Sequence, residues 1–123
     1  MGLDQYAFIE IDGKDQEIAY WRKHNRLQGW MENLWLSKGG LAQGGRGEFN
    51  CVRLFLTAED IDDLERAIKN RDLPQTQGFF YGPDSYLRDG NETYPDYEND
   101  IAFINKARES LKKGQKVYYT CWW

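Results

Sequence analysis

The chain has 123 residues, of which 41% are hydrophobic and 29% charged, a composition typical of one folded domain rather than a disordered chain. No apolar run approaches the about 20 residues that a transmembrane helix needs, and the first residues lack the basic and apolar segments of a signal peptide. The formal net charge of −4 argues against generic nucleic-acid binding. We therefore expect a single domain over residues 1–123 that does not contact a membrane.

Two strands are expected at the start of the chain. Residues 3–11 are rich in the β-branched and aromatic side chains that favour strands, and Asp12-Gly13 then signals a turn. The short apolar run 18–21 predicts a second, minor strand that forms a hairpin with the first.

A helix is predicted over residues 25–36, because apolar side chains recur there on one helical face. The residues of that face are Leu27, Trp30, Met31, Leu34 and Trp35. Asn25 is placed to cap the helix. Gly29 lies inside it at a cost of about 1 kcal/mol relative to Ala, which predicts either close packing at Gly29 or a later helix start.

Five glycines within residues 39–47 predict a flexible connection to the next strand, expected over 48–56 and buried on both faces over 52–56. The glycine-rich segment leads from a helix into a strand, which is the reverse of a phosphate-binding loop, and it lacks the Gly-Lys-Ser/Thr ending. A second helix is predicted to begin after Thr57, its capping residue. Its apolar stripe consists of Ile61, Leu64 and Ile68.

The last third predicts a short strand over 76–81, a turn-rich segment over 82–95 and a third helix over 96–113, capped by Asp96. The apolar residues of this helix are Tyr97, Ile101, Ile104, Ala107 and Leu111. Gly114 is a favourable helix stop, and residues 115–122 predict the last strand.

Strands that alternate with helices indicate helices packed on one sheet. We expect an α+β or mixed α/β domain, with a single mixed β-sheet of four to five strands and three helices packed mainly on one face. The second helix has the length of a right-handed crossover between two strands.

Four blocks of the sequence, in the same order, carry a family likeness. They include Tyr20-Trp21-Arg22-Lys23, the run Gly78-Phe79-Phe80, the opening 1–6 and the ending 118–123. In these blocks the chain resembles a family of small phage and prophage proteins. The resemblance implies a phage setting and action in the host cytoplasm, and it transfers no catalytic residue. The chain departs from the family pattern in its glycine-rich loop and at Cys121, where Ser is expected, which argues against this thiol as a catalytic group.

A basic cluster surrounds the expected start of the first helix. Arg22, Lys23, His24 and Arg26 lie where free backbone N–H groups and the helix dipole favour anions. Tyr20 and Trp21 could stack a base beside them. The alternative is a solvated basic turn that flanks core aromatic residues.

His24 is the only histidine, and its spacing from the two cysteines matches no zinc motif. Cys51 and His24 could form a nucleophile–base pair, although a free Cys in a strand is more often a small buried hydrophobic residue. Cys51 and Cys121 could also form a disulfide if their strands are adjacent. An intracellular setting favours two free thiols.

Aromatic residues make up 15% of the chain, more than so small a core can hide. We expect an exposed aromatic rim that includes Tyr20, Trp30, Tyr81, Tyr118, Trp122 and Trp123. Tyr, Trp and Arg together form the composition of binding hot spots.

We therefore predict one concave ligand-binding surface, to which three segments of the chain contribute. Its residues are Tyr20, Trp21, Arg22, Lys23, His24, Asn25, Gln77, Tyr81, Tyr119 and Trp122. The competing hypothesis is that Arg22 and Lys23 pair with Asp4, Glu10 or Glu17.

The function expected is that of a phage-type accessory protein, a non-enzymatic binder of a host protein or of a small anionic or nucleotide-like ligand. The alternative is a small enzyme that acts on a nucleotide-like or phosphorylated substrate. We assign no catalytic residue, cofactor or metal ligand.

Overall fold

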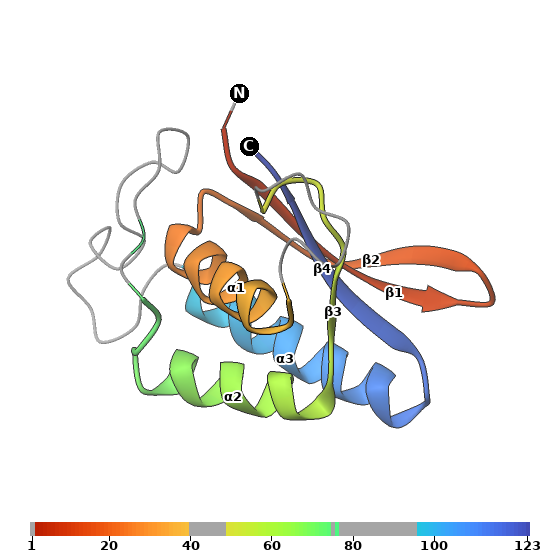
Figure 1. Ribbon diagram of the computed structural model, residues 1–123. Coiled ribbons are helices and arrows are strands. Elements are labelled where there is room, and N and C mark those ends of the chain that lie inside the picture. Colours follow the sequence, from red (N-terminus) through yellow and green to blue (C-terminus); the bar gives the residue numbers. More distant parts are fainter. Residues whose placement is uncertain (1, 40–48, 75, 77–95) are drawn as a thin grey trace.

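A computed structural model describes residues 2–39, 49–74, 76 and 96–123. In this part of the chain seven elements follow one another: β1 (Asp4–Ile11), β2 (Lys14–Arg22), α1 (Asn25–Ser37), β3 (Leu54–Leu56), α2 (Ala58–Lys69), α3 (Tyr97–Lys112) and β4 (Lys116–Trp122). The strands form one sheet in the order β2-β1-β4-β3 (Figure 1). This arrangement confirms the α+β class with three helices.

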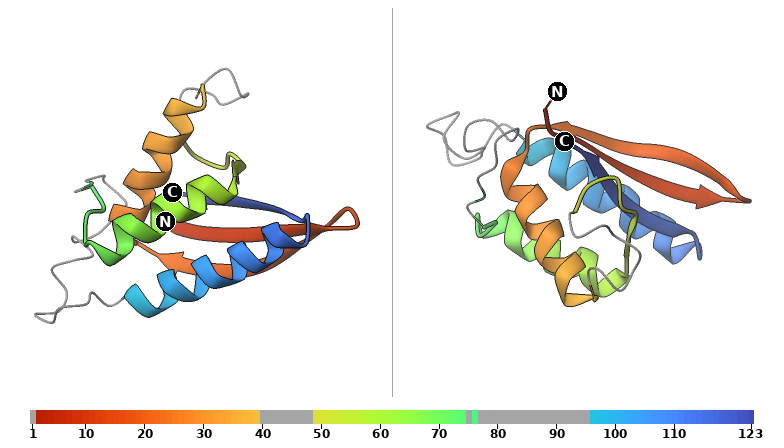
Figure 2. Two further views of the ribbon diagram at one scale, coloured as in Figure 1. Left: turned by 90° about the horizontal axis from the view of Figure 1, so that it is seen from below. Right: turned by 45° about the horizontal axis from the view of Figure 1, so that its top comes forward.

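All three helices lie on the same face of the sheet (Figures 1 and 2). We expected a mixed sheet, but every strand pair among the described residues is antiparallel. Among the described residues, two helices separate β3 from β4. The chain leaves the end of β3 through α2 and returns through α3 to the same end of the sheet. The following strand therefore runs opposite to β3. The strand expected over 76–81 lies outside the described residues except for Thr76, which is not in a strand.

The β1–β2 hairpin is longer than the sequence predicts. Its turn residues Asp12 and Gly13 have φ values of 52° and 79°, as a two-residue turn between antiparallel strands requires. β2 spans nine residues instead of the minor strand expected over 18–21. Residues 14–17 are polar and exposed, so they carry no hydrophobic signal, and pairing with β1 extends the strand.

The third strand is shorter than predicted. Among residues 49–56, the described part of the expected strand, only Leu54–Leu56 is a strand, and Cys51 has a φ of 60°, which interrupts the extended backbone. The expectation of burial on both faces is wrong, because among the described residues β3 is an edge strand with helices on one side only. Phe55 points to the other side and is 42% exposed. Lys38 Nζ donates hydrogen bonds to the Phe55 carbonyl, at 2.9 Å, and to Asp60.

The first helix agrees closely with the prediction, except at its cap. Its N-cap is His24, which makes no side-chain capping bond, and Asn25 is the buried first residue of the helix. Trp30 and Leu34 are partly buried against the core, whereas the rest of the predicted face is fully buried: Leu27, Met31 and Trp35. Gly29 is closely packed, because a Cβ there would overlap Thr76.

The second helix has the predicted cap and apolar stripe. The Thr57 side chain accepts a hydrogen bond from the Asp60 N–H, and the Asp60 carboxylate accepts one from the Thr57 N–H. The buried stripe consists of Ile61, Leu64 and Ile68.

In the third helix Asp96 is the N-cap residue without a side-chain capping bond, and Gly114, at φ 79°, follows the helix end as expected. Phe103 is buried on this helix, although the predicted apolar face omits it.

Candidate functional site

The predicted site residues divide between the two faces of the sheet. Tyr20, Arg22 and Trp122 point to the face without helices, where Asp4 lies between Arg22 and Trp122 in the strand register. Four further predicted residues face the helices or the start of α1 and are buried: Trp21, His24, Asn25 and Tyr119. Lys23 is partly buried in the turn between β2 and α1. Gln77 and Tyr81 lie outside the described residues.

Trp21 and His24 share one buried acceptor. The Asp100 carboxylate of α3 receives a hydrogen bond from Trp21 Nε1 at 2.7 Å and lies 2.8 Å from His24 Nε2. The Trp21 ring also packs edge-on against Phe103, with 5.2 Å between ring centroids. These contacts connect β2 and the start of α1 to α3.

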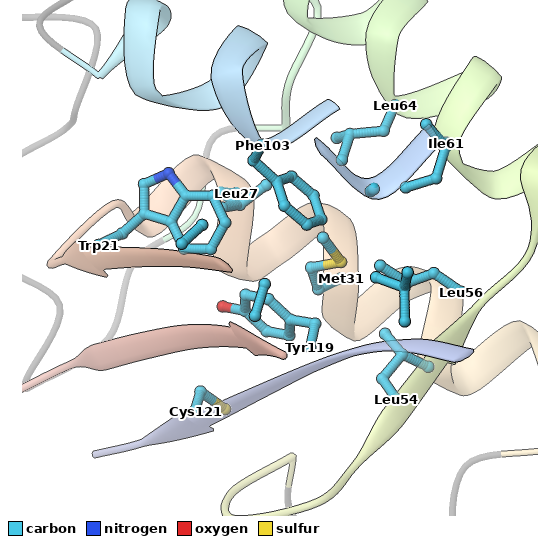
Figure 3. Close-up of a cluster of buried hydrophobic side chains, with 14 of the residues drawn as sticks. Trp21, Leu27, Met31, Leu54, Leu56, Ile61, Leu64, Phe103, Tyr119 and Cys121 are labelled. Carbon is cyan, nitrogen blue, oxygen red and sulfur yellow. The ribbon is translucent and has the colours of Figure 1, made fainter. Parts of the chain in front are cut away.

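A second buried group of polar side chains fastens α1 to the middle strands. Gln5 Oε1 accepts the His24 N–H at 2.8 Å, and Gln5 Nε2 donates to the His24 carbonyl and to the Tyr119 hydroxyl, each at 2.9 Å. The Tyr119 hydroxyl in turn donates to Gln28 Oε1, and Gln28 Nε2 donates to Cys121 Sγ. Figure 3 shows Trp21, Tyr119 and Cys121 within the same cluster as the apolar side chains of the helices.

These buried residues form a structural network. Their side chains are shielded from solvent, and their polar atoms bond to one another, as buried polar groups require. No sequence pattern predicted the roles of Gln5, Gln28 and Asp100. The sequence contains one indication of their burial: each is a polar residue on a strand or helix face whose other residues are apolar.

The open face, as we call the side of the sheet without described helices, carries a band of aromatic residues across all four strands. The residues that point to the open face are Asp4, Tyr6, Phe8, Glu10, Asp15, Glu17, Tyr20, Arg22, Arg53, Phe55, Lys116, Tyr118, Thr120 and Trp122. Tyr20 and Phe55 are each 42% exposed and Trp122 is 68% exposed. No described helix lies on this side of the sheet (Figures 1 and 2).

Contacts between rings order this band. Ring centroids lie 5.2 Å apart for Tyr6 and Tyr20, 5.3 Å for Phe8 and Tyr118, and 5.4 Å for Phe55 and Tyr118. The Arg53 guanidinium lies over the Tyr118 ring, 5.1 Å from its centroid. Tyr118 is therefore only 3% exposed although it faces outward.

Arg22 has a partner on the neighbouring strand. Its guanidinium lies 2.7 Å from Asp4 Oδ1, which also accepts the Tyr20 hydroxyl at 2.7 Å. The Tyr20 hydroxyl and then the Arg22 guanidinium lower the pKa of Asp4. The competing hypothesis, that Arg22 pairs with Asp4, is thus confirmed for this residue.

A hollow of about 380 Å³ lies at this end of the open face. It is lined by Gly2, Asp4, Tyr6, Arg22, Trp122 and Trp123. Trp123 is held in place by Nε1, which donates to the Phe49 carbonyl at 2.8 Å. The hollow therefore combines aromatic rings with a neutralised ion pair.

Both cysteines are free, as expected. Cys121 is buried, and burial raises the pKa of its thiol to about 12, so the reactive thiolate is scarce near neutral pH. Cys51 is exposed, whereas His24 is buried against Asp100, so these contacts give no support to a nucleophile–base pair.

In the described ranges, no group of three or more His, Cys, Asp or Glu side chains is arranged to hold a metal ion. No helix in the part of the chain that the structure describes is long and apolar enough to cross a membrane. No protein-family model matches the sequence, and neither a curated protein nor a solved structure is significantly similar to it.

Proposed function

We propose that the chain is a phage-type accessory protein that acts in the host cytoplasm by binding a host protein, without catalysis, on the open face. The observation that carries this proposal is the exposed aromatic band, in particular Tyr20, Phe55 and Trp122. Exposed Tyr and Trp beside Arg are the residues that dominate protein–protein binding energies.

The ring contacts of the open face favour its use in binding. Side chains that are ordered before a partner arrives lose less conformational freedom on binding. Phe8 stacks with Tyr6 and with Tyr118, and Arg53 is held over Tyr118. The band therefore offers a large, ordered apolar centre with charged residues at both ends.

The charges favour a protein partner over an anionic one. A small anion at Arg22 has to compete with Asp4, whose Oδ1 lies 2.7 Å from the Arg22 guanidinium, so this ion pair offers an anion little net attraction. The remaining charges of the face are also mixed in sign. This mixture argues against a nucleic-acid surface, which needs a basic excess.

Capture of proteins from a bacterial lysate tests this proposal with a matched pair of variants. Tyr20→Ser with Trp122→Ser removes two exposed rings from the open face. Leu36→Ser, which removes a 57% exposed side chain from α1, is the control. We expect a defined protein to be retained by the wild type and by Leu36→Ser, and lost from the double variant. Equal capture by all three chains contradicts the proposal.

The alternative is a small enzyme or binder that acts on a nucleotide-like or phosphorylated ligand in the hollow beside Arg22. It predicts that such compounds raise the melting temperature of the wild type and leave that of Arg22→Ala unchanged. Our proposal predicts no stabilisation of either chain. A thermal-shift series over nucleotides and phosphorylated metabolites separates the two functions.

A further inference from the structure

We infer that the hollow beside the Arg22–Asp4 ion pair binds a side-chain carboxamide, the group of Gln and Asn, of the host protein that covers the open face. The inference rests on the proposed use of this face for protein binding and names the chemistry that the face recognises. Its support is the hydrogen bonding that the ion pair leaves unused, which matches the donor and the acceptor of a carboxamide.

The hollow extends across three neighbouring strands. Arg22 of β2, Asp4 of β1 and Trp122 of β4 lie opposite one another in the register, at the end of the sheet where β1 begins and β4 ends (Figure 1). Tyr6 and Trp123 also line the hollow. The site of about 380 Å³ therefore places the ion pair beside aromatic rings.

The ion pair keeps hydrogen-bonding groups in reserve. The Tyr20 hydroxyl and the Arg22 guanidinium both donate to the same oxygen of Asp4, Oδ1, at 2.7 Å each. No donor bonds to Asp4 Oδ2 among the residues that the structure describes. A guanidinium has five N–H donors, and that of Arg22, whose side chain is 51% exposed, gives one of them to Asp4. One unused acceptor therefore lies next to further donors.

A covering protein has to satisfy these groups. Hydrogen bonds from the Tyr20 hydroxyl and then from Arg22 lower the pKa of Asp4, so the carboxylate is ionised near neutral pH and only accepts hydrogen bonds. A partner on the open face removes water from Asp4 Oδ2 and from the Arg22 N–H groups. Because a buried polar group without a partner costs free energy, the host protein must bring a donor for Asp4 and an acceptor for Arg22.

A carboxamide carries both groups on one edge. Its oxygen accepts a hydrogen bond, and one N–H of its NH2 group points to the same side as the oxygen. In a trans peptide bond the N–H and the C=O point in opposite directions, so one main-chain amide does not serve both members of the pair. A carboxylate is repelled by Asp4 and an ammonium group by Arg22, whereas the neutral carboxamide is attracted by both.

The rings of the hollow add apolar contact. Trp122 is 68% exposed, so its indole is accessible to the aliphatic part of a Gln or Asn side chain. Tyr6 lies against Tyr20, with 5.2 Å between ring centroids, and Trp123 Nε1 donates to the Phe49 carbonyl. These contacts order two walls of the hollow before a partner arrives, which lowers the entropy lost on binding.

Titration of tripeptides, followed by NMR, tests the inference. The probes are N-acetyl-Phe-Xaa-Phe N-methylamides in which Xaa is Gln, Glu, Lys, Leu, or Gln with a dimethylated side-chain nitrogen. The N-methylamide end leaves the Gln side chain as the sole carboxamide with an NH2 group. The Gln peptide should shift the indole N–H signals of Trp122 and Trp123. It should bind on the order of 10-fold more tightly than the other peptides, since each of those leaves Asp4 Oδ2 or Arg22 without a partner.

Asp4→Asn is the decisive variant. Asn keeps an oxygen for Arg22 and Tyr20 and turns an NH2 group to the hollow, so both members of the pair then donate. The preferred probe should change from the Gln to the Glu peptide. Asp72→Asn, which makes the same charge change at an exposed residue after α2, should keep the Gln preference.

Circular dichroism establishes that each variant is folded. If Asp4→Asn is not, Arg22→Ala replaces it and should prefer the Lys peptide, because Asp4 has then lost its guanidinium partner. Uridine is the probe for a competing ligand, since the uracil ring also carries adjacent N–H and C=O groups. Uridine that binds more tightly than the Gln peptide assigns the hollow to a nucleobase and overturns the inference.

Equal affinity of the wild type for all the peptides, or no binding of any at its highest soluble concentration, also overturns the inference. So does a Gln preference that the folded Asp4→Asn or Arg22→Ala variant retains. Capture of a host protein is measured separately from peptide binding. Capture without a Gln preference therefore contradicts only this inference, and a Gln preference without capture contradicts only the proposed function.

Discussion

The two faces of the central strands use the same kinds of residue for different purposes. On the helix side, Trp21 and Tyr119 are buried and their polar atoms bond to Asp100, Gln5 and Gln28. On the open face, rings such as Tyr6 and Trp122 contact neighbouring rings or solvent. The difference shows that an aromatic residue beside polar ones indicates a binding site only where both remain accessible.

The largest expected change in stability concerns the helix side of the sheet. Trp35→Ala removes a side chain that is 2% exposed and packs on Phe49, with 5.4 Å between ring centroids. The substitution should lower the free energy of unfolding by about 3–5 kcal/mol, because it leaves a cavity in the core. Urea denaturation measures this loss. A change in the free energy of unfolding no larger than that of a surface substitution would mean that Trp35 lies outside the core, and the contrast between the two faces would not hold.

The second effect concerns the buried network. Asp100→Ala removes the acceptor of Trp21 Nε1 and the partner of His24 Nε2. We expect a loss of about 2–4 kcal/mol, because each unsatisfied buried donor costs about 1–3 kcal/mol. Asp100→Asn, which keeps one acceptor oxygen, should lose less. Equal stability of the wild type and Asp100→Ala in thermal denaturation would mean that the network is not structural.

The third effect is a dependence of stability on pH, which arises at Asp60, near the end of β3. Burial raises the pKa of Asp60, but hydrogen bonds from Lys38 and Thr57 outweigh burial and hold the pKa below its ordinary value of 3.8. Because the pKa is lower in the folded chain, this carboxylate stabilises the fold above pH 3.8 and ceases to do so as the pH falls through the folded pKa.

Asp60→Asn checks this dependence. The difference in free energy of unfolding between wild type and variant should be about 1–3 kcal/mol at neutral pH, as for hydrogen bonds to a charged group, and should shrink below pH 3.8. A difference that stays constant down to acidic pH would assign the stabilisation to another group.

The smallest effect belongs to the open face. Trp122→Ala removes a side chain that is 68% exposed, so the free energy of unfolding should change by no more than about 0.5 kcal/mol. Urea denaturation of the wild type and of the variant makes the measurement. A decrease in the free energy of unfolding as large as that of Trp35→Ala would show that both faces of the sheet stabilise the fold, which contradicts the difference drawn between them.

Periodicity sufficed for much of the fold. The spacing of apolar residues predicts α1 to within one residue at its end and the buried stripe of α2, because a helix that packs on a sheet must present an apolar stripe. The length of β2 was not predictable in the same way. Residues 14–17 are polar and take a strand conformation only because β1 pairs with them. Strand order also depends on contacts between distant segments, which a local pattern does not encode.

The candidate site was predictable only in part. The sequence predicts residues 20–25 as part of one binding surface, but alternation along β2 places Tyr20 and Arg22 on one face and Trp21 on the other. The Asp4–Arg22 pair was among the alternatives, since both lie in the predicted hairpin. Asp100 was out of reach, because its contacts with Trp21 and His24 join segments about 80 residues apart in the chain.

The hydrogen bond from Lys38 Nζ to the Phe55 carbonyl has a consequence for aggregation. Edge strands invite the addition of further strands, and association through an edge can continue from copy to copy into fibres. At β3 the edge is three residues long and an ammonium group occupies one of its carbonyls, so strand addition meets a charge that must first be displaced. Lys38→Ala should therefore expose this edge, and the variant should form thioflavin-positive aggregates sooner than the wild type.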